Sequence, residues 1–187
     1  MGLDAGMKFD PDAELVARVG RGDRAAAQAL MARHLPKMLS LARRMLSGQA
    51  EAEDCVQEAF LRLWTHAARW KPGAAKFETW LYRVTLNQCY DRLRKKPAAP
   101  LEAAAQVADP APGPEANLVN AALAAEVEAA LQTLPERQRA AVLLCHYQGH
   151  GNIEAAEILG VGVEALESLL ARARRTLRTK LSHLRES

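Results

Sequence analysis

Apolar positions along this sequence recur with the period of an α-helix wherever a pattern is present. In the N-terminal half, one run places successive side chains on a single helical face: Leu30, His34, Met38, Leu41 and Met45. Asp12 and Asp23 stand where helix N-caps are expected, and Gly48 is expected to end the helix that contains this run. The same period predicts further helices over about 50–68 and 77–95.

The C-terminal part repeats this pattern, with helices expected near 122–132, 136–147, 153–159 and 163–184. The stretch between the halves is rich in Pro and Ala and carries no Lys or Arg, which is typical of an extended, mobile tether. We therefore expect an all-α fold of two small helical domains joined by a flexible linker. The expected divisions are a disordered N-terminus over 1–11, a first domain over 12–96, a linker over 97–121 and a second domain over 122–187.

Composition adds little to this picture. The chain is 49% hydrophobic and 25% charged, as in ordinary globular proteins, and its net charge of +3 is too small to indicate a partner. Cys55, Cys89 and Cys145 are far apart and form no CxxC pair, so we expect reduced thiols and neither a metal nor another cofactor. The sequence shows no membrane-spanning run and no signal peptide over 1–10, which predicts a cytoplasmic protein.

The helix expected over 50–68 has one acidic and one apolar face. Glu51, Asp54 and Glu58 share the acidic side. The other side has the spacing of a core stripe: Val56, Phe60, Leu63 and Trp64. Acidic side chains near a helix start also interact favourably with the helix dipole. The pattern therefore fits either a well-capped surface helix or a docking face.

The helix expected over 77–95 combines cations with aromatic rings. One face is polar and charged: Arg83, Asn87, Tyr90, Asp91 and Arg94. Aromatic residues are interleaved through the segment: Trp70, Phe77, Trp80, Tyr82 and Tyr90. Because cations neutralise phosphates and rings stack on unpaired bases, this mixture suits single-stranded DNA better than intact duplex. The alternative is that Phe77, Trp80 and Tyr82 are simply core residues.

Residues 152–166 have the layout of a helix-turn-helix. Ala156 is small where a second helix must cross, and Gly160 permits the tight turn. The final helix then carries five cations: Arg172, Arg174, Arg175, Arg178 and Lys180. Such a helix can lie in the major groove and contact phosphates or guanine edges. Glycine turns between helices are common, so this pattern alone leaves DNA binding open.

Three motifs taken together resemble a known family. The segment EAEDCVQEAFLRLW over 51–64 resembles the AEDxxQExFLxxW signature of sigma region two. The stretch over 77–94 resembles the FxTWLYRxxxNxxxDxxR pattern of extracytoplasmic-function sigma factors. LPERQR over 134–139, with the helix-turn-helix, resembles sigma region four. On this order of motifs the chain is identified as a member of that group of small sigma factors, with a resemblance over about 12–96 and 125–182.

The resemblance implies a subunit that binds core RNA polymerase and directs initiation at −10 and −35 promoter elements, with no chemistry of its own. The clamp of the largest polymerase subunit would contact Asp54, Gln57, Glu58 and Leu61. The melted −10 strand would contact Trp70, Lys76, Phe77, Trp80, Arg83, Asn87, Asp91, Arg94 and Lys95. The −35 duplex would contact Glu164, Glu167, Ser168, Arg172 and Arg175. An anti-sigma factor that covers both domains, and a role in a stress response, are further implied.

The recognition helix departs from the family pattern SxxTVKSRLxRAR. Glu164 and Glu167 lie near its start and repel phosphates, although a glutamate can accept a hydrogen bond from cytosine. One rival reading is a DNA-binding regulator that uses the helix-turn-helix without polymerase. Another is an enzyme, but the sequence shows no Gly-rich phosphate loop, nucleophile–base pair or metal cluster.

Overall fold

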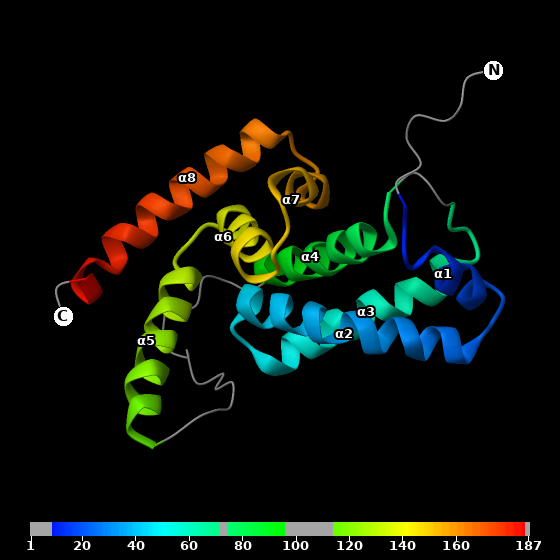
Figure 1. The fold of residues 1–187 in the computed structure, drawn as a ribbon, viewed down its shortest axis with the longest axis horizontal. Helices are drawn as coiled ribbons and strands as arrows, with labels where there is room; N and C mark the ends of the chain where they lie inside the picture. The colour runs from blue at the N-terminus through cyan, green and yellow to red at the C-terminus, as the bar shows by residue number, and fades with distance from the viewer. Residues whose placement is uncertain (1–8, 72–74, 96–113, 186–187) are drawn as a thin grey trace.

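The computed structural model describes residues 9–71, 75–95 and 114–185, the side chains of 114–121 and 185 excepted. Every regular element within these residues is helical, which confirms the all-α prediction (Figure 1). In chain order the elements are α1 (Ala13–Gly20), α2 (Arg24–Leu46), α3 (Gln49–Ala67), α4 (Phe77–Lys95), α5 (Pro114–Gln132), α6 (Glu136–Val142), the π-helical turn η1 (Leu143–Tyr147), α7 (Asn152–Leu159), α8 (Val163–Lys180) and the 3₁₀ turn η2 (Ser182–Arg185).

Helices α1 to α4 form the first domain around one apolar core. The predicted stripe of α2 is buried along its whole length, from Leu30 to Met45. On α3 the stripe is buried at Val56, Phe60 and Leu63, whereas Trp64 is 44% exposed, so the core prediction was wrong for that ring. The core therefore reaches the last turn of α3 only through the small side chain of Ala67.

Two predicted helix caps differ from the structure. Asp23 caps α2 as expected, accepting from the amides of Ala25 and Ala26 at 2.9 and 3.1 Å. Asp12 precedes α1, but its carboxylate makes no cap and instead binds His34 Nε2 at 2.7 Å. Ser47, at φ 54°, ends α2 in the left-handed conformation. Gly48 is instead the N-cap of α3, so its prediction as the end of α2 was wrong by one residue.

The N-terminus was expected to be disordered over 1–11. This was wrong for residues 9–11, which the structure describes, and residues 1–8 lie outside the described residues. Asp10 accepts a hydrogen bond from the amide of Phe77 at 2.8 Å through one carboxylate oxygen. Its other oxygen accepts from the amide of Asp12 at 3.0 Å. Since Phe77 is the first residue of α4, a carboxylate from the start of the chain caps that helix. This long-range cap has no local sequence signal.

The second domain comprises α5 to α8. Helix α5 begins at Pro114 and not near 122, so the predicted linker over 97–121 extended too far. Proline fits the first turn of a helix, and the Ala-, Leu- and Glu-rich residues that follow favour the helix. The remaining linker residues, to 113, lie outside the described residues. In the helix-turn-helix, Gly160 has φ 64°, a conformation that costs other residues energy.

The two domains pack against each other through α4 and α7 and through the C-terminal end of α2, beside which α5 stands in Figure 1. Arg139 of α6 is only 6% exposed and donates to the carbonyl of Met45 at 2.6 Å, as well as to the carbonyls of Leu131 and Gln132. Gln132 in turn donates to the carbonyl of Arg44 at 2.7 Å. Burial lowers the pKa of Arg139 below its usual range, and the carbonyls satisfy its guanidinium donors.

The three cysteines are free, as expected: Cys55 and Cys89 are buried, and Cys145 is partly buried. None of the described helices combines the length and the apolar composition needed to cross a membrane.

Candidate nucleic-acid and polymerase interfaces

An apolar groove runs between α2 and α3 on the first domain. It has a volume of about 340 Å³, and its walls come from these two helices alone: Met31, Leu35, Leu39, Glu53, Val56, Gln57, Phe60, Leu61 and Trp64. Leu61 is 58% exposed and thus presents an apolar side chain to solvent. Apolar surface of this kind, rimmed by polar groups, is typical of a protein-binding site. Of the residues predicted to bind the polymerase, Gln57 and Leu61 lie in the groove.

The other two predicted docking residues form an acidic edge beside it. Asp54 and Glu58 both pair with Arg92 of α4, at 3.5 and 2.9 Å. The side chains of Asp54 and Glu58 nevertheless remain 62% and 46% exposed. Both interpretations of the acidic helix therefore have support, since the carboxylates join α3 to α4 and still present charge to a partner.

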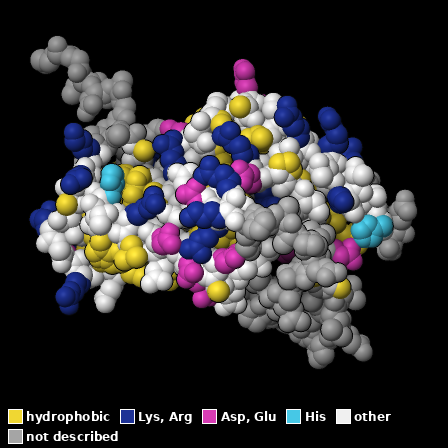
Figure 2. Space-filling model, turned by 180° about the vertical axis from the view of Figure 1, so that it is seen from behind, with side chains coloured by type: hydrophobic (Ala, Val, Ile, Leu, Met, Phe, Trp, Pro, Cys, Tyr) yellow, Lys and Arg dark blue, Asp and Glu magenta, His cyan; other side chains and the backbone are white. Residues whose placement is uncertain are grey.

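Helix α4 presents several of the residues predicted to bind the melted strand. Asn87, Arg94 and Lys95 are exposed, and Asp91 pairs with Arg94. Figure 2, which shows the molecule from behind, has Lys and Arg side chains near the middle of this face, with Asp and Glu side chains between them. Lys76 and Arg83, nearer the start of the helix, face the second domain: Lys76 binds Glu154 of α7 at 3.0 Å, and Arg83 donates to the carbonyl of Glu157 at 2.9 Å.

Three of the predicted aromatic residues, Trp70, Phe77 and Trp80, form one cluster at the start of α4. Trp70 and Trp80 meet edge to face at 5.9 Å, and both are half-buried. His66, which sequence reasoning missed, stacks on Trp80 with ring centroids 5.1 Å apart and planes at 7°. The spacing of His66 and Trp70, one helical turn apart, was the available signal. A stack of exposed imidazole and half-buried indole is a surface on which a base can lie.

Phe77 and Tyr82 are fully buried, so the core interpretation is confirmed for these two rings. Phe77 contacts Trp70 and Trp80 at centroid distances of 5.9 and 5.8 Å. Its ring cannot stack on a base without leaving the core, but it supports the two tryptophans that can. Burial also raises the pKa of Tyr82 well above its usual range, and its hydroxyl donates to Gln148 Oε1 of the second domain at 3.0 Å.

The residues predicted to read the −35 duplex are all exposed on α8: Glu164, Glu167, Ser168, Arg172 and Arg175. Leu166, Leu170 and Ala173 are buried on the other side of the helix, which fixes its orientation. Glu167 accepts from the side-chain amide of Asn152 at 3.3 Å. The acidic start of this helix is thus held by its neighbour α7.

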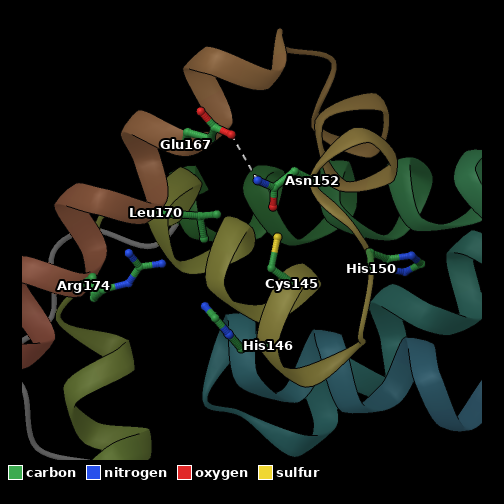
Figure 3. A pocket seen from close by; sticks show the side chains of 7 residues that line it. All are labelled: Cys145, His146, His150, Asn152, Glu167, Leu170 and Arg174. Atoms are coloured by element: carbon green, nitrogen blue, oxygen red, sulfur yellow. Dashed lines mark hydrogen bonds between the residues drawn. The ribbon is translucent and has the colours of Figure 1, made fainter.

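A cavity of about 430 Å³ lies between η1, α7 and α8 and is lined by Cys145, His146, His150, Asn152, Glu167, Leu170 and Arg174 (Figure 3). The close-up shows the side chains of Cys145, His146 and His150 pointing in different directions. In the described part of the chain, no group of three His, Cys, Asp or Glu side chains is placed to hold a metal ion. The cavity belongs to the packing of the helix-turn-helix.

A helix-turn-helix domain joined to a domain with a basic, aromatic helix and an apolar docking groove defines a two-domain DNA-binding protein that works with a protein partner. Two family models match these domains: Sigma-70 region 2 over residues 30–98, and Sigma-70, region 4 over residues 124–177. The chain belongs to the extracytoplasmic-function (ECF) family of RNA polymerase sigma factors. It is an alternative sigma factor, which binds core RNA polymerase and promoter DNA.

Two curated relatives cover most of the chain. The ECF RNA polymerase sigma factor SigM of Mycobacterium tuberculosis is 38% identical over 176 residues, which cover 92% of this chain and 86% of SigM. SigW of Bacillus subtilis is 31% identical over 180 residues, or 90% of this chain and 96% of SigW. Among solved structures, CnrH in complex with the cytosolic domain of CnrY aligns with a TM-score of 0.72 and 27% identity, covering 93% of this chain and 99% of CnrH.

Proposed function

We propose that three surfaces of this chain divide the work of promoter recognition. The α2–α3 groove with its acidic edge docks the polymerase, α4 with its aromatic cluster holds the melted −10 strand, and α8 reads the −35 duplex. The observation that carries the proposal is the exposed apolar groove on the domain whose other side presents the cations and rings of α4. A regulator that acted without polymerase would have no use for that groove.

The docking step uses Gln57 and Leu61 in the groove and the carboxylates of Asp54 and Glu58 beside it. A helix of the partner can bury its apolar face on Leu61, while cations on its flank meet the carboxylates. Because the carboxylates are already fixed by Arg92, they lose little side-chain freedom on binding.

The strand-binding step uses the Trp70, Trp80 and His66 rings for bases and the cations of α4 for phosphates. Base stacking on aromatic side chains contributes about 1–3 kcal/mol per base. Asn87 lies exposed on the same helix and carries both donors and an acceptor for the edge of an extruded base. These contacts offset the cost of unpairing the promoter.

The test is initiation by purified core RNA polymerase at a matched promoter, with a paired substitution in the groove. Leu61→Glu places a charge against apolar surface and is expected to weaken core binding at least tenfold. Leu123→Glu is the control, because Leu123 is a comparably exposed apolar residue (43%) on α5, away from the groove. Equal binding by the two variants, or no initiation by the unmodified chain, would sink the proposal.

The proposal also covers the regulation of the chain and its location in the cell. CnrH was solved with the cytosolic domain of CnrY, and a Bartonella quintana sigma factor with an anti-sigma factor. By analogy we propose that an anti-sigma factor controls this chain in a stress response. We propose further that the chain acts in the cytoplasm and supplies no catalysis of its own. Co-purification of the tagged protein from its host identifies the partner, and recovery of core polymerase alone contradicts the regulatory part.

A further inference from the structure

The exposed side of α8 changes from acidic to basic along the helix. Opposite the buried side, exposed side chains follow one another at the spacing of helical turns and form an outward stripe: Glu164, Ser168, Ala171 and Arg175. Cations begin only at Arg172, whereas the residues of α8 before it include two glutamates and no Lys or Arg. In Figure 1 the start of α8 lies at an outer edge of the molecule, beside its turn from α7. The end of the helix that is presented most openly is therefore the acidic one.

The two glutamates at this end have different surroundings. Glu167 accepts from Asn152 Nδ2 at 3.3 Å, and Figure 3 shows its side chain directed at Asn152 of α7. Glu164 lies three residues earlier, on the outward stripe, and is exposed. Within the described residues, its carboxylate takes part in no hydrogen bond or ion pair. Glu164 therefore keeps all of its acceptor sites for a ligand.

The outward stripe divides its work by position when the helix enters DNA. The second helix of a helix-turn-helix places its N-terminal residues against base edges in the major groove. From Glu164 to Arg175 the stripe spans about 17 Å at ~1.5 Å per residue, which exceeds the groove width of about 12 Å. With the start of the helix against the bases, Arg175 is thus carried toward the phosphates of the groove wall. Ser168 pairs with donors and acceptors alike, and Ala171 has no polar group, so neither excludes a base by its hydrogen bonding.

The chemistry of Glu164 favours one base. An ionised carboxylate only accepts hydrogen bonds, and in the major groove only cytosine N4 and adenine N6 donate them. In an A·T pair, N6 lies between two acceptors, N7 of adenine and O4 of thymine, which repel a carboxylate. In a G·C pair, N4 lies at the end of the row and has an acceptor on one side only, O6 of guanine. Cytosine is therefore the best partner, while guanine and thymine leave a desolvated charge without a donor.

We propose that Glu164 is a specificity-determining residue of this interface, whose carboxylate selects cytosine at the −35 base pair that faces the start of α8. The inference rests on the proposed function, because it takes α8 as the helix that reads the duplex. Repulsion between Glu164 and the phosphates is offset by the cations later in the same helix and by the partial positive charge at the helix start. The cations supply affinity that does not depend on sequence, and Glu164 supplies discrimination.

The experiment uses the full-length chain with core RNA polymerase and a matched promoter whose −35 region is randomised. Templates retained by the holoenzyme are sequenced, which gives the preference for each base at each position. The unmodified chain is expected to prefer cytosine at one position by about five- to a hundredfold, the scale of one good base contact. Glutamine carries a donor beside its acceptor and matches N6 and N7 of adenine, so Glu164→Gln is expected to move the preference at that position to adenine.

A matched control separates base selection from a general effect of charge. Glu126→Gln removes the same charge from an exposed carboxylate (46%) on α5 of the same domain, which pairs with His183, and it is expected to leave every base preference unchanged. If Glu164→Gln changes the retention of all templates alike, or leaves the cytosine preference intact, the inference is overturned and the proposed function stands. If the unmodified holoenzyme shows no base preference anywhere in the −35 region, both are overturned.

Discussion

Asp12 shows how a single buried carboxylate joins elements of the first domain. It lies at the start of α1, is 2% exposed, and binds His34 and Arg33 of α2. Burial acts to raise the pKa of Asp12, but the hydrogen bonds and charges of His34 and Arg33 outweigh it and hold the pKa below its usual value. The ionised form is therefore the one that the fold stabilises.

Asp12 makes the free energy of unfolding depend on pH in the acid range. Because the folded pKa lies below the unfolded value of 3.8, the contribution of Asp12 is fully present above pH 4 and is lost as the pH falls through the folded pKa. Asp12→Asn is expected to lower the free energy of unfolding at pH 7 by about 2 kcal/mol, with a smaller difference from the unmodified chain at pH 3. Urea unfolding at the two pH values measures this. Glu14→Gln, at an exposed position of α1, is the control, and an equal loss in both variants would refute the assignment.

Residue identity predicted some of these roles and not others. Asp23 has the short-range signature of an N-cap and acts as one. Asp10 and Asp12 act on partners far away in the sequence, and a carboxylate carries no local mark of such a partner. The same holds for Arg83 and Arg139, because the acceptors of Arg83 and most acceptors of Arg139 are backbone carbonyls that every residue possesses.

At the scale of elements, helix periodicity was enough to predict the bounds of a helix when one face of that helix is buried. The bounds of α4 were predicted within a residue because its apolar seam runs from end to end. The start of α5 was missed because its N-terminal turns follow a Pro-rich stretch. Among candidate site residues, periodicity placed the α8 set on one exposed side, but it could not show that Phe77 is core and Trp80 half-buried.

The junction of α1 and α3 depends on Gly20, the last residue of α1. A Cβ on Gly20 would lie 2.9 Å from the carbonyl oxygen of Ala67 and 3.0 Å from the Cα of Ala68, both backbone atoms that cannot rotate away. Gly20→Ala is therefore expected to lower the free energy of unfolding by about 1–3 kcal/mol. Thermal unfolding measures it. Gly151→Ala, where a Cβ meets nothing within 4 Å, changes only the N-cap of α7 and is expected to cost less than about 1 kcal/mol. A loss there as large as that of Gly20→Ala would contradict the steric explanation.

At the scale of the whole molecule, two domains were predictable and their packing was not. The motifs fixed the order of the domains along the chain, whereas the contact between α4 and α7 uses one surface ion pair and a carbonyl. Surface pairs of this kind contribute at most about 1 kcal/mol each. This part of the domain contact is therefore weak, whereas the buried Arg139 joins carbonyls of both domains at the end of α2. Opening of both parts is expected when the chain binds two promoter elements.

The reach between domains gives a test of that opening. The segment 96–113 joins α4 to α5 and can span at most about 60 Å. Deletion of residues 100–109 reduces this limit to about 30 Å. The shortened chain is expected to bind core polymerase normally but to lose initiation at least tenfold at promoters of ordinary spacing. In vitro transcription on templates with the two elements moved closer is the measurement, and full activity at ordinary spacing would show that the domains need not separate.

The position of the α2–α3 groove within the first domain bears on how the molecule searches the chromosome. A bacterial genome offers on the order of 10⁶ or more non-specific sites, and a free subunit with exposed strand-binding cations would be scattered among them. Because the groove is formed by α2 and α3 alone, docking of polymerase needs no change in the packing of the two domains. We therefore expect the number of searching complexes to follow the supply of polymerase and not that of the subunit alone.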